Sequence, residues 1–215
     1  MQVIADDVSV DSFDVVVVGA GAAGLSAARQ LEELDVAVLA DAAPVCGGSS
    51  GRARGGIAAP VGGDDAPQLH ARDTRSAGAG LCAPGAVDAL VSNAERTIRE
   101  MQSLGVEFDR DDSGELELGR EAAHSRARIV HAGGDAIGVS LTEALASDVF
   151  DGTSEPVLLE GEMLDVCAPE GRVEGVVYRN ARGDVRAAAA PAVVLATGGV
   201  GWMYGRTTNP PQSTG

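Results

Sequence analysis

An α/β fold, with a parallel sheet and flanking helices, is predicted by three features near the N-terminus. Residues 14–18 contain four consecutive valines, and β-branched residues without a polar face are typical of a strand buried on both sides. A helical stripe follows at the spacing of one helix face, formed by Leu25, Ala28, Leu31 and Leu34. Residues 36–40 are again apolar and indicate the next parallel strand, so the three segments predict a β-α-β unit.

The turn between the first strand and its helix carries Gly19, Gly21 and Gly24 in the spacing G-x-G-x-x-G. Gly19 permits the tight turn, Gly21 leaves room for a pyrophosphate at the backbone, and Gly24 lets helix pack on strand. The free N–H groups and positive dipole end of the helix then face the phosphates. Asp41 stands about 20 residues further on, where an acid binds ribose hydroxyls. We interpret this unit as a dinucleotide site, with NAD and FAD both open and a purely structural turn as the alternative.

The rest of the chain alternates between helical and extended patterns. Residues 42–68 lack periodicity and are rich in glycine and proline, which predicts a loop. Helices are expected over residues 69–80, 84–104 and about 136–149, the second opened by a proline and ended by a glycine. A small β-hairpin region turns at residues 180–184, and a buried strand beside the first one follows it. The expected strands cover residues 156–167, 173–178, 185–189 and 192–196.

The loop has a centre of its own, Gly47–Ile57, in which Gly-Gly pairs flank small hydroxyl residues. Such a sequence lets backbone run close along a flat polar ligand, because glycine adopts conformations that other residues avoid. A flexible linker is the alternative interpretation. The apolar residues 57–60 that follow indicate that the chain returns to a core.

Composition limits the classes of partner. The net charge is −16, and all sixteen basic residues are arginine. An acidic surface of this kind repels nucleic acid and anionic membranes, so we expect neither as a partner. The excess of acids without lysine suggests a salt-adapted (halophilic) source. We expect a cytoplasmic protein without signal peptide or membrane span. Cys46, Cys82 and Cys167 lack metal-ligand spacing, so we expect reduced thiols and no metal site.

Residues 120–131 hold a dense group of basic side chains in this acidic chain: Arg120, His124, Arg126, Arg128 and His131. A positive island would focus an anionic substrate. The alternative for Arg126 and Arg128 is that they balance surface acids, and His124 can equally be a hydrogen-bonded core residue. His70 has no motif around it, and we assign it no role.

Six motifs in family order make the chain resemble the N-terminal part of L-aspartate oxidase, in the flavoprotein superfamily of succinate dehydrogenase and fumarate reductase. They are Gly19–Gly24, Ser49–Ala59, Asp73–Cys82, Arg120–Ala132, Val193–Gly199 and Thr207–Pro210. The resemblance implies a Rossmann-like FAD-binding domain over residues 1–215, truncated before the capping domain. The arginine that the family uses as a proton shuttle would also lie beyond residue 215, so residues 1–215 alone are not expected to turn over.

The resemblance assigns the cofactor contacts residue by residue. The pyrophosphate would lie on the first glycine turn, the ribose at Asp41, and the Gly/Ser loop along pyrophosphate and isoalloxazine. The backbone of Glu162 and Met163 would meet the adenine, and a second glycine turn would contact the flavin. The implied FAD-binding residues are Gly19, Ala20, Gly21, Ala22, Ala23, Gly24, Asp41, Ser49, Ser50, Gly51, Arg52, Ala53, Arg54, Gly55, Gly56, Glu162, Met163, Thr197, Gly198 and Gly199.

Two positions refine the expectation within the superfamily. Membrane-bound succinate dehydrogenases attach FAD through a histidine that aligns with Ser49, and serine cannot form that bond, which implies non-covalent FAD. Family aspartate oxidases place a glutamate at the position of Glu121 to face the substrate ammonium group, where a carboxylate is the fitting partner. His124 is a second candidate for the catalytic site. Arg54 departs from the usual glutamine of the family, so it either stabilises reduced flavin or turns outward.

The implied reaction is the FAD-dependent oxidation of L-aspartate to iminoaspartate, the first step of NAD biosynthesis, with a functional link to quinolinate synthase. Oxygen, fumarate or a quinone would accept the electrons. One alternative is a soluble fumarate reductase or succinate dehydrogenase flavoprotein subunit. The other is an inactive, truncated nucleotide-binding remnant.

Overall fold

The computed structural model describes residues 9–41, 48–152 and 155–215, and its chain divides into two compact units. The first unit is Met1–Arg52 together with Leu145–Gly215, and the second is Ala53–Ala144. The long helix α4 (Ile137–Phe150) belongs to the second unit up to Ala144 and to the first from Leu145. Each unit has its own sheet and core, and each is described separately below.

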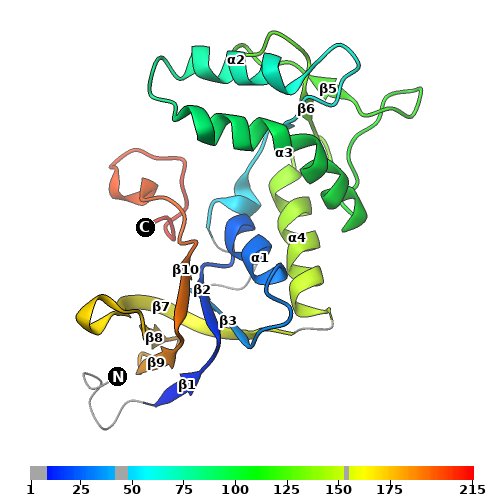
Figure 1. Cartoon of the computed structure of the whole chain (residues 1–215). Helices are drawn as coiled ribbons and strands as arrows, with labels where there is room; N and C mark the ends of the chain where they lie inside the picture. The colour runs from blue at the N-terminus through cyan, green and yellow to red at the C-terminus, as the bar shows by residue number, and fades with distance from the viewer. Residues whose placement is uncertain (1–8, 42–47, 153–154) are drawn as a thin grey trace. The chain divides into compact units, whose positions relative to one another are not determined.

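The first unit is built on a seven-stranded sheet in the order β1-β9-β8-β7-β3-β2-β10 (Figure 1). Its parallel centre joins β2 (Val15–Val18) to β3 (Val36–Ala40) on one side and to β10 (Ala192–Leu195) on the other. Val15 is paired with Val36 and with Ala192. The predicted β-α-β unit and the predicted place of the 192–196 strand beside it are therefore confirmed.

Strand β7 (Val157–Cys167) changes partner along its length. Its first residues pair in parallel with β3, and the rest pairs antiparallel with β8 (Gly175–Asn180). β8 and β9 (Val185–Ala189) form the predicted hairpin, whose turn is held by the bond from the N–H of Asn180 to the carbonyl of Asp184. β1 (Val10–Ser12) pairs in parallel with β9 and was not predicted, because three residues are too few to show a period.

The core of the first unit is made of small branched residues. Val16, Ala37 and Val176 are fully buried, and Leu39 is 1% exposed. Helix α1 (Ala22–Arg29) turns Leu25 and Ala28 to this interior, but it ends five residues before the predicted stripe does. Leu34 is 44% exposed and forms a turn with Leu31. The chain must reverse there to begin β3, so this leucine does not continue the helix.

The second unit combines helices with a three-stranded sheet. α2 (Pro67–Ala77) and α3 (Pro84–Ser103) lie side by side (Figure 1). The antiparallel sheet has the order β4-β6-β5, with β4 at Ile57–Ala58, β6 at Ile129–Val130 and β5 at Leu118–Gly119. These two-residue strands were not predicted, since none is long enough to alternate visibly. Three-residue 3-10 turns occur at Ser50–Arg52, Pro169–Gly171 and Gly201–Met203.

The core of the second unit confirms two expectations. Ala59 is fully buried beside Ile98, Val106 and Val130, so the chain after the Gly/Ser loop does return to a core. Gly105, with φ +92°, follows the end of α3 in the conformation that glycine favours there. α2 begins at Pro67 rather than at residue 69, because proline suits the first helical position. Among the helices of the described residues, none is long and apolar enough to cross a membrane.

Candidate functional site

A cavity of about 260 Å³ opens in the first unit where β2, β3 and β10 end. The carboxyl ends of parallel strands are where open α/β sheets bind their ligands. Ligand pockets commonly measure about 300–1,000 Å³, so this cavity suits one part of a dinucleotide rather than all of it. Its walls are Gly19, Ala20, Gly21, Ala23, Ala40, Asp41, Gly48, Ser49, Ser50, Leu195, Ala196, Thr197, Gly198, Gly199, Gln212 and Ser213.

The first glycine turn needs its glycines because other backbone atoms pack directly against two of them. Gly19 has φ +110°, and a Cβ there would overlap the backbone carbonyl of Ala196, the residue directly after β10. A Cβ on Gly24 would overlap the carbonyl oxygen of Gly19 itself. Both side chains must therefore be hydrogen for α1 to pack on the turn and for β10 to pass beside it. The roles predicted for Gly19 and Gly24 are confirmed.

Ser50 lies against the N-terminus of α1. Its Oγ accepts a hydrogen bond of 3.0 Å from the backbone N–H of Ala22, and a Cβ on Gly21 would stand 3.0 Å from the same oxygen. The neighbouring Ser49 exchanges a hydrogen bond of 3.0 Å with Ser213 and donates one of 3.2 Å to Asn209. The Gly/Ser loop and the C-terminal residues of the chain thus meet at the glycine turn.

The other predicted contacts in the first unit divide into two groups. Asp41 directly follows β3 and the turn Thr197–Gly199 directly follows β10, so both line the cavity. Glu162 and Met163 do not line it. Glu162 is exposed on β7 and pairs with Arg179 at 3.3 Å, and Met163 packs on the core. Gly51 and Arg52 complete the short 3-10 turn, and neither lines the cavity.

The remaining loop residues, Ala53–Gly56, belong to the second unit, where Asp135 holds them. Its carboxylate accepts a hydrogen bond of 2.8 Å from the N–H of Gly55 and lies 3.7 Å from the guanidinium of Arg54. The carbonyl of Ala53 accepts a bond of 3.1 Å from Gly138 at the start of α4. Gly55 and Gly56 have φ values of +87° and +122°. The loop is therefore fixed to the end of one helix through polar contacts.

Glu121 lies beside this loop. Its Oε1 is 3.6 Å from the position that a Cβ on Gly55 would take, and its side chain is exposed. The carbonyl of Glu121 accepts a hydrogen bond of 3.0 Å from the N–H of His124, which closes a turn. Arg120 donates from Nε to the carbonyl of His124 at 2.9 Å. Both predicted catalytic candidates therefore stand on one short turn.

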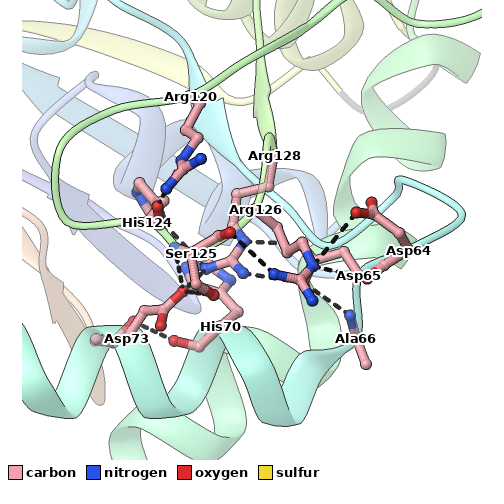
Figure 2. Close-up of polar contacts among 11 residues, drawn as sticks. Asp64, Asp65, Ala66, His70, Asp73, Arg120, His124, Ser125, Arg126 and Arg128 are labelled. Carbon is pink, nitrogen blue, oxygen red and sulfur yellow. Dashed lines mark hydrogen bonds and ion pairs between the residues drawn. The ribbon is translucent and has the colours of Figure 1, made fainter.

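Arg128 is fully buried, which overturns the surface interpretation for this residue (Figure 2). Its Nε and Nη2 donate to the two carboxylate oxygens of Asp65 at 2.7 and 2.9 Å. Its Nη1 donates to Asp73 at 2.9 Å and contacts His124 Nδ1 at 3.1 Å. Arg126, by contrast, pairs with Asp64 at 3.3 Å with both side chains partly or largely exposed. For Arg126 the charge-balancing alternative is confirmed.

Asp73 gathers a second set of donors from the same turn. It accepts a bond of 2.7 Å from the hydroxyl of Ser125 and one of 2.8 Å from its N–H. These bonds, with the guanidinium of Arg128, hold the pKa of Asp73 well below its usual range. Burial opposes charge on Arg128, but the hydrogen bonds that the guanidinium donates to Asp65 and Asp73 outweigh burial and raise the pKa of Arg128.

His70 on α2 completes this buried cluster. It is 3% exposed, and its ring centroid is 5.6 Å from that of His124. Burial, followed by Arg128 and His124, lowers its pKa, although Asp65 and Asp73 act in the opposite direction. Sequence analysis assigned His70 no role and did not connect Asp65 or Asp73 with Arg128, because these pairings join residues more than fifty positions apart. Cys82 and Cys167 are free thiols, and Cys46 lies outside the described residues.

The fold and the cavity are those of a dinucleotide-binding domain, and the comparisons identify the family. A family model described as "FAD binding domain" matches residues 14–215. The chain belongs to this FAD-binding family. The expected Rossmann-like α/β fold and the expected FAD cofactor are thereby confirmed.

The individual relatives are L-aspartate oxidases. The chain is 43% identical over 210 residues to the enzyme of Streptomyces coelicolor, a match that covers 94% of this chain and 36% of the relative. It is 41% identical over 210 residues to the enzyme of Mycobacterium tuberculosis, covering 95% of this chain and 39% of that one. The chain thus spans little more than a third of the length of these relatives.

Solved structures of related flavoproteins share the fold. The Mycobacterium smegmatis Sdh1 complex in the apo form superposes with a TM-score of 0.89 at 28% identity, covering 97% of this chain and 38% of the other. An E. coli quinol fumarate reductase gives a TM-score of 0.90 at 26% identity, covering 95% and 36%. The resemblance to the superfamily of succinate dehydrogenase and fumarate reductase is confirmed.

Proposed function

We propose that this chain is the FAD-binding part of an enzyme that oxidises L-aspartate to iminoaspartate. The observation that carries the proposal is the cavity at the ends of β2, β3 and β10, which joins the two glycine turns to Asp41 and Ser50. The 41–43% identity to L-aspartate oxidases over 210 residues supports the choice of reaction. FAD, when bound, would take up the hydride from the substrate α-carbon.

The residues present fit a dinucleotide. Gly19 and Gly21 leave the backbone open at the N-terminus of α1, whose dipole favours the negative charge of a pyrophosphate. Asp41 directly follows β3, and its exposed carboxylate can accept hydrogen bonds from ribose hydroxyls. The turn Thr197–Gly199 lines the same cavity, and no atom lies within 4 Å of a Cβ added at Gly198 or Gly199. We therefore assign the pyrophosphate and ribose of FAD to this cavity.

The FAD is held without a covalent bond. Ser49 stands where a histidine would attach the flavin, and its hydroxyl is engaged by Asn209 and Ser213. A serine hydroxyl is no substitute for an imidazole in that linkage. Denaturing the FAD-loaded protein in acid should leave all flavin in the supernatant. Yellow colour that stayed with the precipitated protein would contradict this part of the proposal.

The substrate side of the proposal rests on Glu121. Its exposed carboxylate beside Gly55 can accept hydrogen bonds from an ammonium group, and charge-assisted bonds of this kind are roughly twice as strong as neutral ones. Arg120 and His124 on the same turn offer donors to carboxylates. The turn therefore suits an amino dicarboxylate, which carries both kinds of charge.

A fumarate reductase is the second candidate, favoured by the structural similarity to an E. coli quinol fumarate reductase. Glu121 argues against it, because a carboxylate repels a dianion that has no ammonium group. Kinetics of the full gene product that contains this sequence would separate the two. We expect oxidation of L-aspartate with oxygen or fumarate as acceptor, and Glu121→Gln should raise KM for L-aspartate. Fumarate reduction without any L-aspartate oxidation would favour the second candidate.

The product of the proposed L-aspartate oxidation, iminoaspartate, is an unstable imine that a following enzyme must consume quickly. The proposal therefore places this protein at the first step of NAD biosynthesis, immediately before quinolinate synthase. Adding that enzyme to the assay should convert the product into quinolinate. Accumulation of oxaloacetate alone in the coupled assay would count against the link.

A further inference from the structure

The feature that carries a further inference is the contact between Arg128 and His124 within the buried cluster (Figure 2). Arginine has five N–H donors and no acceptor. The 3.1 Å contact between its Nη1 and His124 Nδ1 is therefore a hydrogen bond only if Nδ1 carries a lone pair. The proton of a neutral His124 must then reside on Nε2.

The guanidinium cannot turn away from this contact, because three hydrogen bonds to carboxylates fix its plane. Nε and Nη2 are both taken by Asp65, whose side chain is as fully buried as that of Arg128. One hydrogen of Nη1 points to Asp73 and leaves the other for His124. Two carboxylates from different parts of the second unit thus aim one N–H of Arg128 at the imidazole.

The backbone of His124 is fixed from the other side. Arg120 donates to its carbonyl at 2.9 Å, and its N–H donates to the carbonyl of Glu121 at 3.0 Å. The next residue, Ser125, is tied to Asp73 through both hydroxyl and N–H. Within the described residues, Nε2 of His124 has no hydrogen-bond partner, and the residue is half-buried. The ring is thus oriented, and its Nε2–H is unused by the described residues.

We infer that Arg128 is a positioning residue that fixes His124 in its Nε2–H tautomer, so that His124 donates a hydrogen bond to a substrate carboxylate. His124 then serves as a donor and not as a proton acceptor. This inference rests on the proposed function for the identity of the ligand, but the tautomer itself does not depend on it. Glu121 on the same turn would face the ammonium group, so one turn binds both charges of an amino dicarboxylate.

Nitrogen NMR of the imidazoles tests the tautomer directly. The chain has three histidines, so a long-range 1H–15N spectrum of the labelled 215-residue chain contains three ring systems. We assign them with His70→Gln and His131→Gln. His124 should show the pattern of a bare Nδ1 and a protonated Nε2. The opposite tautomer, or an even mixture of the two, would overturn the inference.

Arg128→Lys tests the cause. Lysine keeps the charge between Asp65 and Asp73 but cannot also direct a planar N–H at the imidazole. His124 should become a mixture of tautomers, while His131 stays unchanged as the internal control. An unchanged His124 in a folded variant, judged by its amide spectrum, would refute the role of Arg128. If this variant does not fold, the tautomer of His124 in the wild-type chain and the His124 variants described next still test the inference.

Two substitutions at His124 test its role toward the ligand in the full gene product. Glutamine places an amide N–H near the position of Nε2, whereas asparagine places it near Nδ1. Losing a hydrogen bond to a charged group costs about 10- to 100-fold in binding, so His124→Asn should raise KM for L-aspartate by about that factor. His124→Gln should raise KM clearly less than His124→Asn does, and it should not shift the pH profile of kcat.

The outcomes separate the inference from the proposed function. Equal losses in both variants, together with a shifted pH profile, would show a proton acceptor and overturn the inference. A gene product without any L-aspartate oxidation would refute the proposed function. In that case the tautomer measured by NMR still confirms or refutes the positioning role of Arg128.

Discussion

At the scale of single residues, this chain shows how little a charge count reveals about location. Asp64 and Asp65 are neighbours in sequence, and each pairs with an arginine of the 120–131 segment. The side chain of Asp64 is 77% exposed, whereas that of Asp65 is fully buried. A buried ion pair has lost its hydration, so each partner depends on the other. The two pairs should therefore differ sharply when one partner is removed.

Asp65→Asn should destabilise the protein by about 3–5 kcal/mol, because it leaves the charge of Arg128 buried without its bidentate partner. Asp64→Asn is the matched control and should cost about 1 kcal/mol or less, as exposed pairs do. Urea unfolding of both variants measures the difference. Equal losses would contradict the buried location of Asp65.

Gly24 allows a second prediction at this scale. Gly24→Ala places a Cβ against the carbonyl oxygen of Gly19, and that oxygen belongs to backbone that cannot move aside as a flexible side chain could. The variant should be strongly destabilised and should lose FAD binding. Gly85→Ala, in the first turn of α3 with no atom near the added methyl, should be neutral or stabilising by about 0.5–1 kcal/mol. Thermal unfolding and flavin fluorescence measure the two effects.

At the scale of elements, the sequence predicted the segments with a repeating hydrophobic pattern and missed the segments that are too short to have one. The strands at residues 15–18 and 36–40 and the helix at 84–103 were predicted because valine runs and a helical stripe extend over several residues. The two-residue strands β4, β5 and β6 carry no period. The structure brings the glycine turn, Asp41 and Thr197–Gly199 together at the cavity, and each of them directly follows a strand. Gln212 and Ser213 in the same wall have no comparable signal.

The N-terminus of α1 provides the prediction for this scale. Ser50 comes from another segment, yet its hydroxyl caps the helix by accepting from the N–H of Ala22. Ser50→Ala should cost about 0.5–2 kcal/mol of stability, the usual value of a helix cap. FAD affinity should fall with it. Ser103→Ala removes an exposed hydroxyl that donates to a helix carbonyl, and it should change neither quantity measurably.

At the scale of the whole molecule, the buried cluster in the second unit should make the free energy of unfolding depend on pH. The folded-state pKa values of His70 and Asp73 both lie below their ordinary values of 6.5 and 3.8. When the folded-state pKa of a group is lowered, the unfolded state binds more protons. The contribution of that group to stability is therefore fully present above its ordinary pKa and is lost as the pH falls. Asp73 therefore matters below about pH 4, and His70 already below about pH 6.5.

We expect the urea midpoint of the chain to fall between pH 7.5 and 5, in part because the unfolded state protonates at His70 while the folded state resists it. His70→Gln removes this contribution, so its midpoint should depend less on pH over the same range. Acid-induced repulsion elsewhere is common to both proteins and cancels in the comparison. Identical pH profiles would show that His70 titrates normally in the folded protein.

The net charge of −16 acts on the whole molecule at once. Like charges repel across the compact state, and salt reduces the range of this repulsion from about 10 Å at 0.1 M to about 3 Å at 1 M. The thermal midpoint of the chain should therefore rise with sodium chloride over that range. Sucrose at matched osmolality controls for general solvent effects. A midpoint that stays constant or falls in salt would show that surface repulsion is not what limits stability.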